Sequence, residues 1–418
     1  MKVPRTGWTE RGGAARVATA LFATFVLAFA SAGTAIAGCC ELAYVEVQER
    51  FDPSWSGVLC RWLQDALGSW TSRVVVAVLR KSSPVVVDFQ LLNARAGWAL
   101  TTHELSWTRD GGRSWDAITP SGVDAGAIRD VFFLDARRGW ALAADPPRAW
   151  TTYVTKDGGR SWAAAPFPGD SRTYGEKAET HLDFVDGVHG WAMVKIPTSS
   201  NFSAGDLFRT VDGGTTWKKL SIPVGDEIDF ADGGLGWIAG GPAGDELYAT
   251  RDAGDTWTRV DVDLPHVFSE STPAYGTPTF FDPRAGVLPV TFTGNPAGFA
   301  FYVTSDGGRT WDRGPVVRSR RSIATGVRLL ADPVTPDVWY VVNPQGRGRM
   351  VSVRGTTVRV ERGEGLGGGA FALDFGTTVV GWVATSHESC PGKTGCTSDV
   401  SLLATKSGGD GWHEISPP

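Results

Sequence analysis

The sequence predicts an all-β fold, a seven-bladed β-propeller of four-stranded blades, and three observations lead to this prediction. A motif with Thr, Asp, Gly and Trp at fixed offsets recurs along the chain. A Gly-Trp pair at the start of an apolar strand recurs between the copies of that motif. From Pro84 to the C-terminus the two features repeat at about 48 residues, a length that suits one four-stranded propeller blade.

The first 38 residues predict a signal peptide. A basic start is followed by an apolar run over 17–37 that ends in small residues, the usual order of an export signal. The same run could instead remain as an uncleaved membrane anchor, because about 20 apolar residues can span a bilayer. Either interpretation takes the rest of the chain out of the cytoplasm.

The end of this leader resembles a bacterial lipobox. Ile36, Ala37 and Gly38 precede Cys39, and the resemblance implies cleavage before Cys39 and acylation of its thiol. We therefore predict a lipoprotein on the outer face of a bacterial membrane. Ordinary cleavage after Ala37 is the alternative, because small residues at positions 35 and 37 also suit that enzyme, and it would give a secreted or periplasmic protein.

The chain has five cysteines, an odd number for an exported protein. Acylation of Cys39 would account for one of them. Cys390 and Cys396 bracket a short loop that a disulfide could close, which leaves Cys40 and Cys60 as the other candidate pair.

Residues 39–83 form a segment outside the repeats. Asp52-Pro53 can begin a short amphipathic helix and Gly68 can end it. We favour packing of this helix against the propeller over contact with a membrane or a partner helix. A strand is predicted at 74–79, which could close the last blade, and residues 412–415 are the alternative for the outer strand of that blade. The apolar face of the helix is Trp55, Val58, Leu59, Trp62, Leu63, Ala66 and Leu67.

The recurring motif has the form Thr-x-Asp-Gly/Ala-Gly-x-Ser/Thr-Trp and resembles the Asp-box, or bacterial neuraminidase repeat, family. In such a turn the Asp carboxylate can accept backbone N–H groups, Gly permits positive φ, and Trp anchors the turn between blades. A sixth copy, 405–412, has Ser407 in place of Asp. The predicted structural residues of the five full copies are Asp110, Trp115, Asp157, Trp162, Asp212, Trp217, Asp252, Trp257, Asp306 and Trp311.

The Gly-Trp pairs give the number of blades. Five are complete, and Gly286-Val287 and Val338-Trp339 fall where the repeat expects two more. The sixth unit, 323–362, has no clear Asp box, so six or eight blades remain alternatives to seven. We assign 84–418 to the propeller. The complete pairs begin at Gly97, Gly139, Gly190, Gly236 and Gly381.

The combination of Gly-Trp-Ala strands with Asp-Gly-Gly boxes is similar to the photosystem II stability and assembly factor type of propeller. Because many bacteria carry such propellers without photosynthesis, the resemblance implies an extracytoplasmic scaffold rather than a photosystem. We therefore predict a monomeric scaffold that binds a protein or a glycan, possibly aiding assembly of an envelope complex.

An enzyme of the sialidase type is the alternative function, since sialidases also carry Asp boxes. Their chemistry needs three arginines around a carboxylate and a Tyr nucleophile with a Glu partner. No first arginine can be assigned here, so we predict no catalytic residues. Under the alternative alone, the candidates are Tyr174 with Glu176, and Tyr275 with Glu270.

The remaining features exclude other classes of function. The formal net charge of −5 argues against nucleic-acid binding. Six scattered histidines show no ligand spacing, so we predict no metal and no cofactor. Arg318, Arg320 and Arg321 form the densest basic cluster, between the fifth and sixth blades. They are the candidate binding residues, on the face opposite the Asp boxes, although a solvated loop is the simpler interpretation.

Overall fold

The computed structural model describes residues 84–418 except 145–148, 176–177, 197–202, 320–321, 325–328, 343–349, 362, 368 and 390–396. The predictions for the signal peptide (1–38), the segment 39–83, Cys39, Cys40 and Cys60 lie outside this part. Those for Cys390, Cys396, Glu176, Arg320 and Arg321 lie outside it as well. Within the described part, no helix has the length and apolar character needed to cross a membrane.

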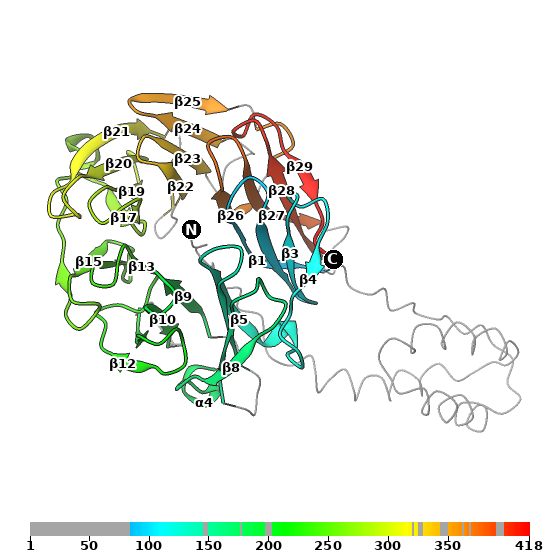
Figure 1. The fold of residues 1–418 in the computed structure, drawn as a ribbon. Helices are drawn as coiled ribbons and strands as arrows, with labels where there is room; N and C mark the ends of the chain where they lie inside the picture. The colour runs from blue at the N-terminus through cyan, green and yellow to red at the C-terminus, as the bar shows by residue number, and fades with distance from the viewer. Residues whose placement is uncertain are drawn as a thin grey trace, which may run out of the picture. The chain divides into compact units, whose positions relative to one another are not determined.

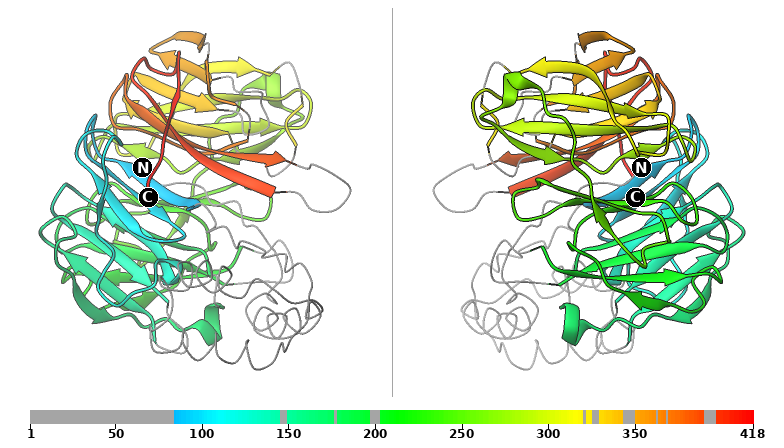
Figure 2. Two further views of the ribbon diagram at one scale, coloured as in Figure 1. Left: turned by 90° about the vertical axis from the view of Figure 1, so that its right-hand side faces the viewer. Right: turned by 90° about the vertical axis from the view of Figure 1, so that its left-hand side faces the viewer.

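Seven antiparallel sheets stand around a central axis, as the sequence predicts (Figure 1). Seen from the side, the strands run between the two faces of the ring (Figure 2). The first four blades contain β1 (Val86–Leu91), β2 (Gly97–Thr101), β3 (Leu105–Thr108) and β4 (Asp116–Ala117); β5 (Ile128–Phe133), β6 (Gly139–Ala143), β7 (Thr151–Thr155) and β8 (Ala163–Pro166); β9 (Thr180–Phe184), β10 (Gly190–Lys195), β11 (Gly205–Thr210) and β12 (Lys218–Leu220); and β13 (Ile228–Phe230), β14 (Gly236–Gly240), β15 (Glu246–Thr250) and β16 (Thr258–Arg259).

Blades five to seven complete the ring, and among the described residues three short helices lie in the connections between blades. The helices are η1 (Ala125–Ala127), α4 (Ser171–Tyr174) and η2 (His266–Phe268). The strands are β17 (Thr272–Tyr275), β18 (Thr279–Phe280), β19 (Gly286–Thr293), β20 (Gly298–Thr304) and β21 (Asp312–Arg318); β22 (Leu330–Thr335), β23 (Val338–Val342), β24 (Met350–Arg354) and β25 (Thr357–Glu361); and β26 (Ala370–Phe375), β27 (Gly381–Ser389), β28 (Thr397–Thr405) and β29 (His413–Ile415).

Two blades depart from the simple repeat. In blade 5 the innermost strand is interrupted, so β17 and β18 both pair with β19 and the sheet has five strands. In blade 6 a tight hairpin at Gly355 joins β24 to β25 where the other blades carry an Asp box. The unit without a box is therefore a complete blade, and the count is seven.

Each blade is built from consecutive strands, including the last one. β29, from the C-terminus, pairs with β28 and supplies the outer strand of blade 7. The sheet of blade 7 therefore contains only strands from the C-terminal end of the described chain.

The Gly-Trp strands are the second strands of their blades and are buried along their whole length in blades 1, 2 and 4 and over Gly190–Val194 in blade 3. They lie inside the sheet and are covered by a neighbouring blade on each side, which is why both alternating faces are apolar up to Lys195, the partly exposed last residue of β10. Their aromatic rings pack on the next blade: Trp140 stacks on Phe184 with ring centroids 3.8 Å apart, and Trp191 on Phe230 at 3.5 Å.

Side chains of the innermost strands also bond to the next blade. The Asp130 carboxylate accepts the backbone N–H of Leu182 at 2.6 Å, and that of Asp183 accepts the N–H of Phe230 at 2.6 Å. We call these bonds inter-blade latches. A carboxylate buried in this way satisfies a backbone donor that would otherwise be unpaired. The other latches from innermost strands join Gln90 to Phe133, Asp332 to Phe375 and Asp374 to Leu91, and in blade 5 Thr291 of the second strand β19 bonds to Leu329 in the same way.

Candidate functional site

The Asp-box turns line one face of the ring, which we call the Asp-box rim. In the first box, Asp110 Oδ1 accepts the backbone N–H groups of Arg113 and Ser114, at 3.0 and 2.9 Å. Its Oδ2 accepts the Ser114 hydroxyl at 2.6 Å. These bonds hold the pKa of the Asp110 carboxyl well below its usual range, led by the Ser114 hydroxyl. The geometry fits a turn-forming role for the Asp of the box.

The glycines and the tryptophan of the box also have structural roles. Gly111 and Gly112 have φ of 77° and 89°, the left-handed region that an L side chain rarely adopts. The Trp of a box reaches back to the preceding blade, and Trp162 Nε1 donates to the carbonyl oxygen of Ile118 at 2.8 Å. This ring fills the seam between two blades and is not free to stack on a ligand.

A central cavity of about 440 Å³ lies among the innermost strands. Its wall is acidic, and Asp332 and Asp374 are buried in it. Burial raises the pKa of both carboxyls, to about 6 for Asp374, and the Asp374 charge raises that of Asp332 further. Within the described residues, no group of three or more His, Cys, Asp and Glu has a metal-binding arrangement. Both carboxylates serve as inter-blade latches.

The opposite face, formed by the connections between blades and the loops between second and third strands, is the connection face. Lys195, at the end of β10, lies 3.2 Å from Glu179 and 3.4 Å from Asp226. Asp226 also accepts the Ser203 hydroxyl and the backbone N–H of Gly241, the latter at 2.8 Å. We call this group, from blades 3 and 4, the Lys195 cluster.

Lys195 is held as a cation. Burial alone would lower its pKa, but the Coulombic attraction of Asp226 and Glu179 outweighs burial, and the pKa is raised. The side chains of Lys195 and Glu179 remain about a third exposed. The cluster therefore offers one cation and two carboxylates to a polar partner at the boundary between two blades.

A second polar group fixes α4 on the same face. The Tyr174 hydroxyl donates to Asp206 Oδ2 at 2.6 Å, and Lys219 Nζ lies 2.7 Å from the same oxygen. Burial and the bond to Asp206 raise the pKa of Tyr174 above its usual value. A nucleophilic tyrosine needs the opposite shift, because the phenolate is the reactive form. In this arrangement Tyr174 anchors the helix beside β11.

The structure places the remaining predicted residues as follows. Tyr275 lies in β17 and is 5% exposed, and burial raises its pKa. Glu270 lies exposed after η2. Arg318 is exposed at the end of β21, next to the connection to blade 6.

Comparisons with known proteins agree with the repeat pattern. Residues 171–325, which span blades 3 to 5, match the family model described as photosynthesis system II assembly factor YCF48. A curated relative, the chloroplastic photosystem II stability/assembly factor HCF136 of Arabidopsis thaliana, is 38% identical over 117 residues. The resemblance to the photosystem II assembly-factor type of propeller is confirmed. The match spans a quarter of this chain and a quarter of the length of that relative.

Solved structures add a likeness of fold. A structure titled YCF48 bound to D1 peptide has 18% identity and a TM-score of 0.49, with 72% of this chain and 90% of that chain covered. A prolyl endopeptidase structure has 12% identity and a TM-score of 0.50, with 79% and 49% covered. At these identities neither likeness extends beyond the fold.

Sequence reasoning missed the polar residues that the fold brings together. Asp206, Asp226 and Lys195 come from different strands or connections, and no local pattern joins them. The latches did leave a signal, because an Asp followed by an apolar residue recurs in the innermost strands, as in Asp183-Phe184 and Asp374-Phe375. That recurrence at the blade period could have indicated them.

Proposed function

We propose that this protein is a non-enzymatic scaffold that works outside the cytoplasm, held to a membrane through lipid at Cys39. In this proposal it binds a protein partner on the connection face and supports assembly of an envelope complex. The match of residues 171–325 to an assembly-factor family carries the proposal. That stretch includes both α4 and most of the connection face of blades 3 and 4.

The chemistry of that face supports binding rather than hydrolysis. The Lys195 cluster presents both signs of charge, which suits a polar protein surface. Tyr174 is committed to Asp206, and its pKa is shifted away from reactivity. Neither the Lys195 cluster nor Tyr174 supplies the nucleophile that glycoside cleavage requires.

Site-directed photocrosslinking in the native host tests the binding proposal. A photoreactive residue at Arg172 in α4 or at Arg318 should yield one crosslinked protein species. The matched control is Val188, which is 45% exposed on the Asp-box rim. The substitution Lys219→Glu should weaken the crosslink from Arg172, since it reverses a charge beside α4. Equal crosslinking from all three positions, or none from Arg172 and Arg318, would contradict the proposal.

Intact mass and fractionation test the anchor. The mature protein should carry the mass of acyl chains and stay with membranes, and both should be lost in Cys39→Ala. A soluble, unmodified chain that begins at Gly38 would show a secreted protein instead.

A further inference from the structure

On the Asp-box rim, the seam between blades 4 and 5 is hollowed into a cavity of about 390 Å³. We call it the seam pocket. Its cationic wall consists of Arg251 from the box of blade 4, Arg284 from the first turn of blade 5, and Arg309 from the box of blade 5. Three separate turns thus contribute one guanidinium each to a single cavity.

The three arginines are oriented by one short stretch of backbone. Arg284 Nε donates to the carbonyl oxygen of Ser305 at 3.3 Å, and Arg309 Nη1 to that of Asp306 at 2.9 Å. Arg251 Nη2 donates to the carbonyl oxygen of Gly307 at 3.0 Å. Three consecutive carbonyl groups therefore hold three guanidiniums. Each guanidinium has five N–H donors, and these bonds use one of them.

Acidic residues lie near the three arginines but do not pair with them directly: Asp232 and Asp306 line the cavity, and Asp282 lies near Arg284. Within the described residues, no carboxylate forms an ion pair with Arg251, Arg284 or Arg309 at 4.0 Å or less. Asp232 accepts the backbone N–H groups of its own turn, both at 2.7 Å. Asp306 is occupied by the turn of its box, and the bonds from Thr310 lower its pKa to about 2.

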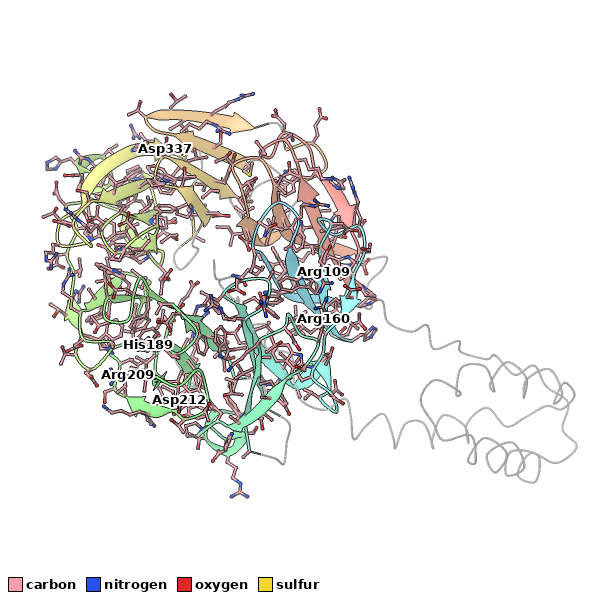
Figure 3. All side chains as sticks on the ribbon, in the orientation of Figure 1. Arg109, Arg160, His189, Arg209, Asp212 and Asp337 are labelled. Atoms are coloured by element: carbon pink, nitrogen blue, oxygen red, sulfur yellow. The ribbon has the colours of Figure 1, made fainter. Side chains whose placement is uncertain are left out.

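The seam between blades 1 and 2 also carries arginines at the equivalent three positions, but one of those arginines forms an ion pair with a carboxylate. Arg109, Arg137 and Arg160 stand where blades 4 and 5 have Arg251, Arg284 and Arg309, and Figure 3 labels Arg109 and Arg160. There Arg109 pairs with Asp116, the residue that follows its own box. Because one of the three equivalent arginines is in an ion pair, the repeat alone does not explain three guanidiniums without a direct carboxylate partner in one cavity.

We propose that the seam pocket binds a doubly charged oxyanion of the phosphate or sulfate type. A tetrahedral dianion offers acceptors in several directions, so it can meet guanidiniums that come from three turns, and guanidinium forks suit such oxygens. The backbone bonds orient the side chains beforehand and reduce the entropy lost on binding. This site lies on the face opposite the connection face and is independent of the proposed partner binding.

Calorimetric titration of the full mature protein tests the site, with inorganic phosphate, sulfate and acetate as probes. Phosphate and sulfate should bind at one site, and acetate at least about tenfold more weakly, because it lacks the second charge. Arg309→Ala and Arg284→Ala should each weaken phosphate binding about tenfold or more. Arg160→Ala and Arg137→Ala, at the same positions of the blade 1–2 seam, should change it less than about twofold.

Two further measurements separate loss of binding from loss of folding and identify the kind of phosphate that binds. Arg309→Lys keeps the charge but loses the fork, so it should bind phosphate with intermediate affinity, and thermal melting of each variant confirms its fold. Glycerol 3-phosphate distinguishes the source: binding as tight as that of free phosphate points to a phosphoryl ester, and its exclusion points to the free ion. Absence of saturable phosphate binding, or an equal loss in Arg160→Ala and Arg309→Ala, overturns the proposal.

Discussion

The carboxylate of Asp374, on the innermost strand of the last blade, accepts the backbone N–H of Leu91, on the innermost strand of the first blade, at 2.7 Å. The two residues are 283 positions apart in the sequence. Since the sheet of blade 7 takes no strand from blade 1, this bond and the packed apolar residues around it join the two ends of the ring. The latch at this seam therefore holds the two ends of the propeller together.

Removal of the latch should destabilise the protein. Asp374→Ala leaves the buried N–H of Leu91 without an acceptor, which costs about 1–3 kcal/mol of unfolding free energy. Urea unfolding measures this loss. Asp261→Ala is the control, because Asp261 is 95% exposed, and it should change the stability by less than about 0.5 kcal/mol. An equal effect in the two variants would show that the latch does not contribute.

The same carboxyl should make stability depend on pH. Burial, with Asp88 nearby, raises the pKa of Asp374 from 3.8 to about 6. The folded state therefore holds the proton more tightly than the unfolded state, and stability falls as pH rises between about 4 and 6. Asp374→Asn keeps an acceptor and cannot ionise, so its stability relative to the wild type should rise over that window. Unfolding midpoints at pH 4 and pH 7 measure this, and a constant difference would contradict the shift.

The sequence predicts the blades well because their signals are local and repeated. The Thr, Asp and Gly of a box bond within one turn, as Thr108 and Asp110 do, so a few residues determine each turn. The interrupted strand of blade 5 and the hairpin of blade 6 break the repeat. The structure was therefore needed to show that each of these two units is one blade. Gly355 at that hairpin has φ of 54°, which a short loop without a box requires.

The candidate sites are less predictable because they form between blades. Lys195 and Asp226 are brought together by packing of blades 3 and 4. Arg251 and Arg309 meet only because neighbouring boxes face one seam. The sequence predicts Arg318, Arg320 and Arg321 as a cluster because they are close together in the chain. The Lys195 cluster and the seam pocket instead form when neighbouring blades pack in the ring.

The worn box of blade 7 offers a gain-of-stability test. There the Ser407 hydroxyl accepts the backbone N–H of Gly411 at 3.1 Å, in the place where the full boxes use a carboxylate. Ser407→Asp should strengthen that bond through its charge and stabilise the protein by about 0.5–1.5 kcal/mol. The gain should disappear at pH values below the pKa of the new carboxyl. Denaturant unfolding at neutral and acidic pH measures both effects, and no gain at neutral pH would contradict the prediction.

Loss of the Tyr174 hydroxyl should release α4. Tyr174 donates to the Asp206 carboxylate at 2.6 Å, and a hydrogen bond to a charged group contributes about 1.5–3 kcal/mol. Because Lys219 still partners Asp206, we expect Tyr174→Phe to fall at the lower end of that range. Hydrogen exchange should increase in residues 171–175 and stay unchanged on the Asp-box rim. Tyr153→Phe, with no phenol bond of this kind, is the control; unchanged exchange in α4 after Tyr174→Phe would mean that its apolar contacts with Trp150 hold the helix without the hydroxyl.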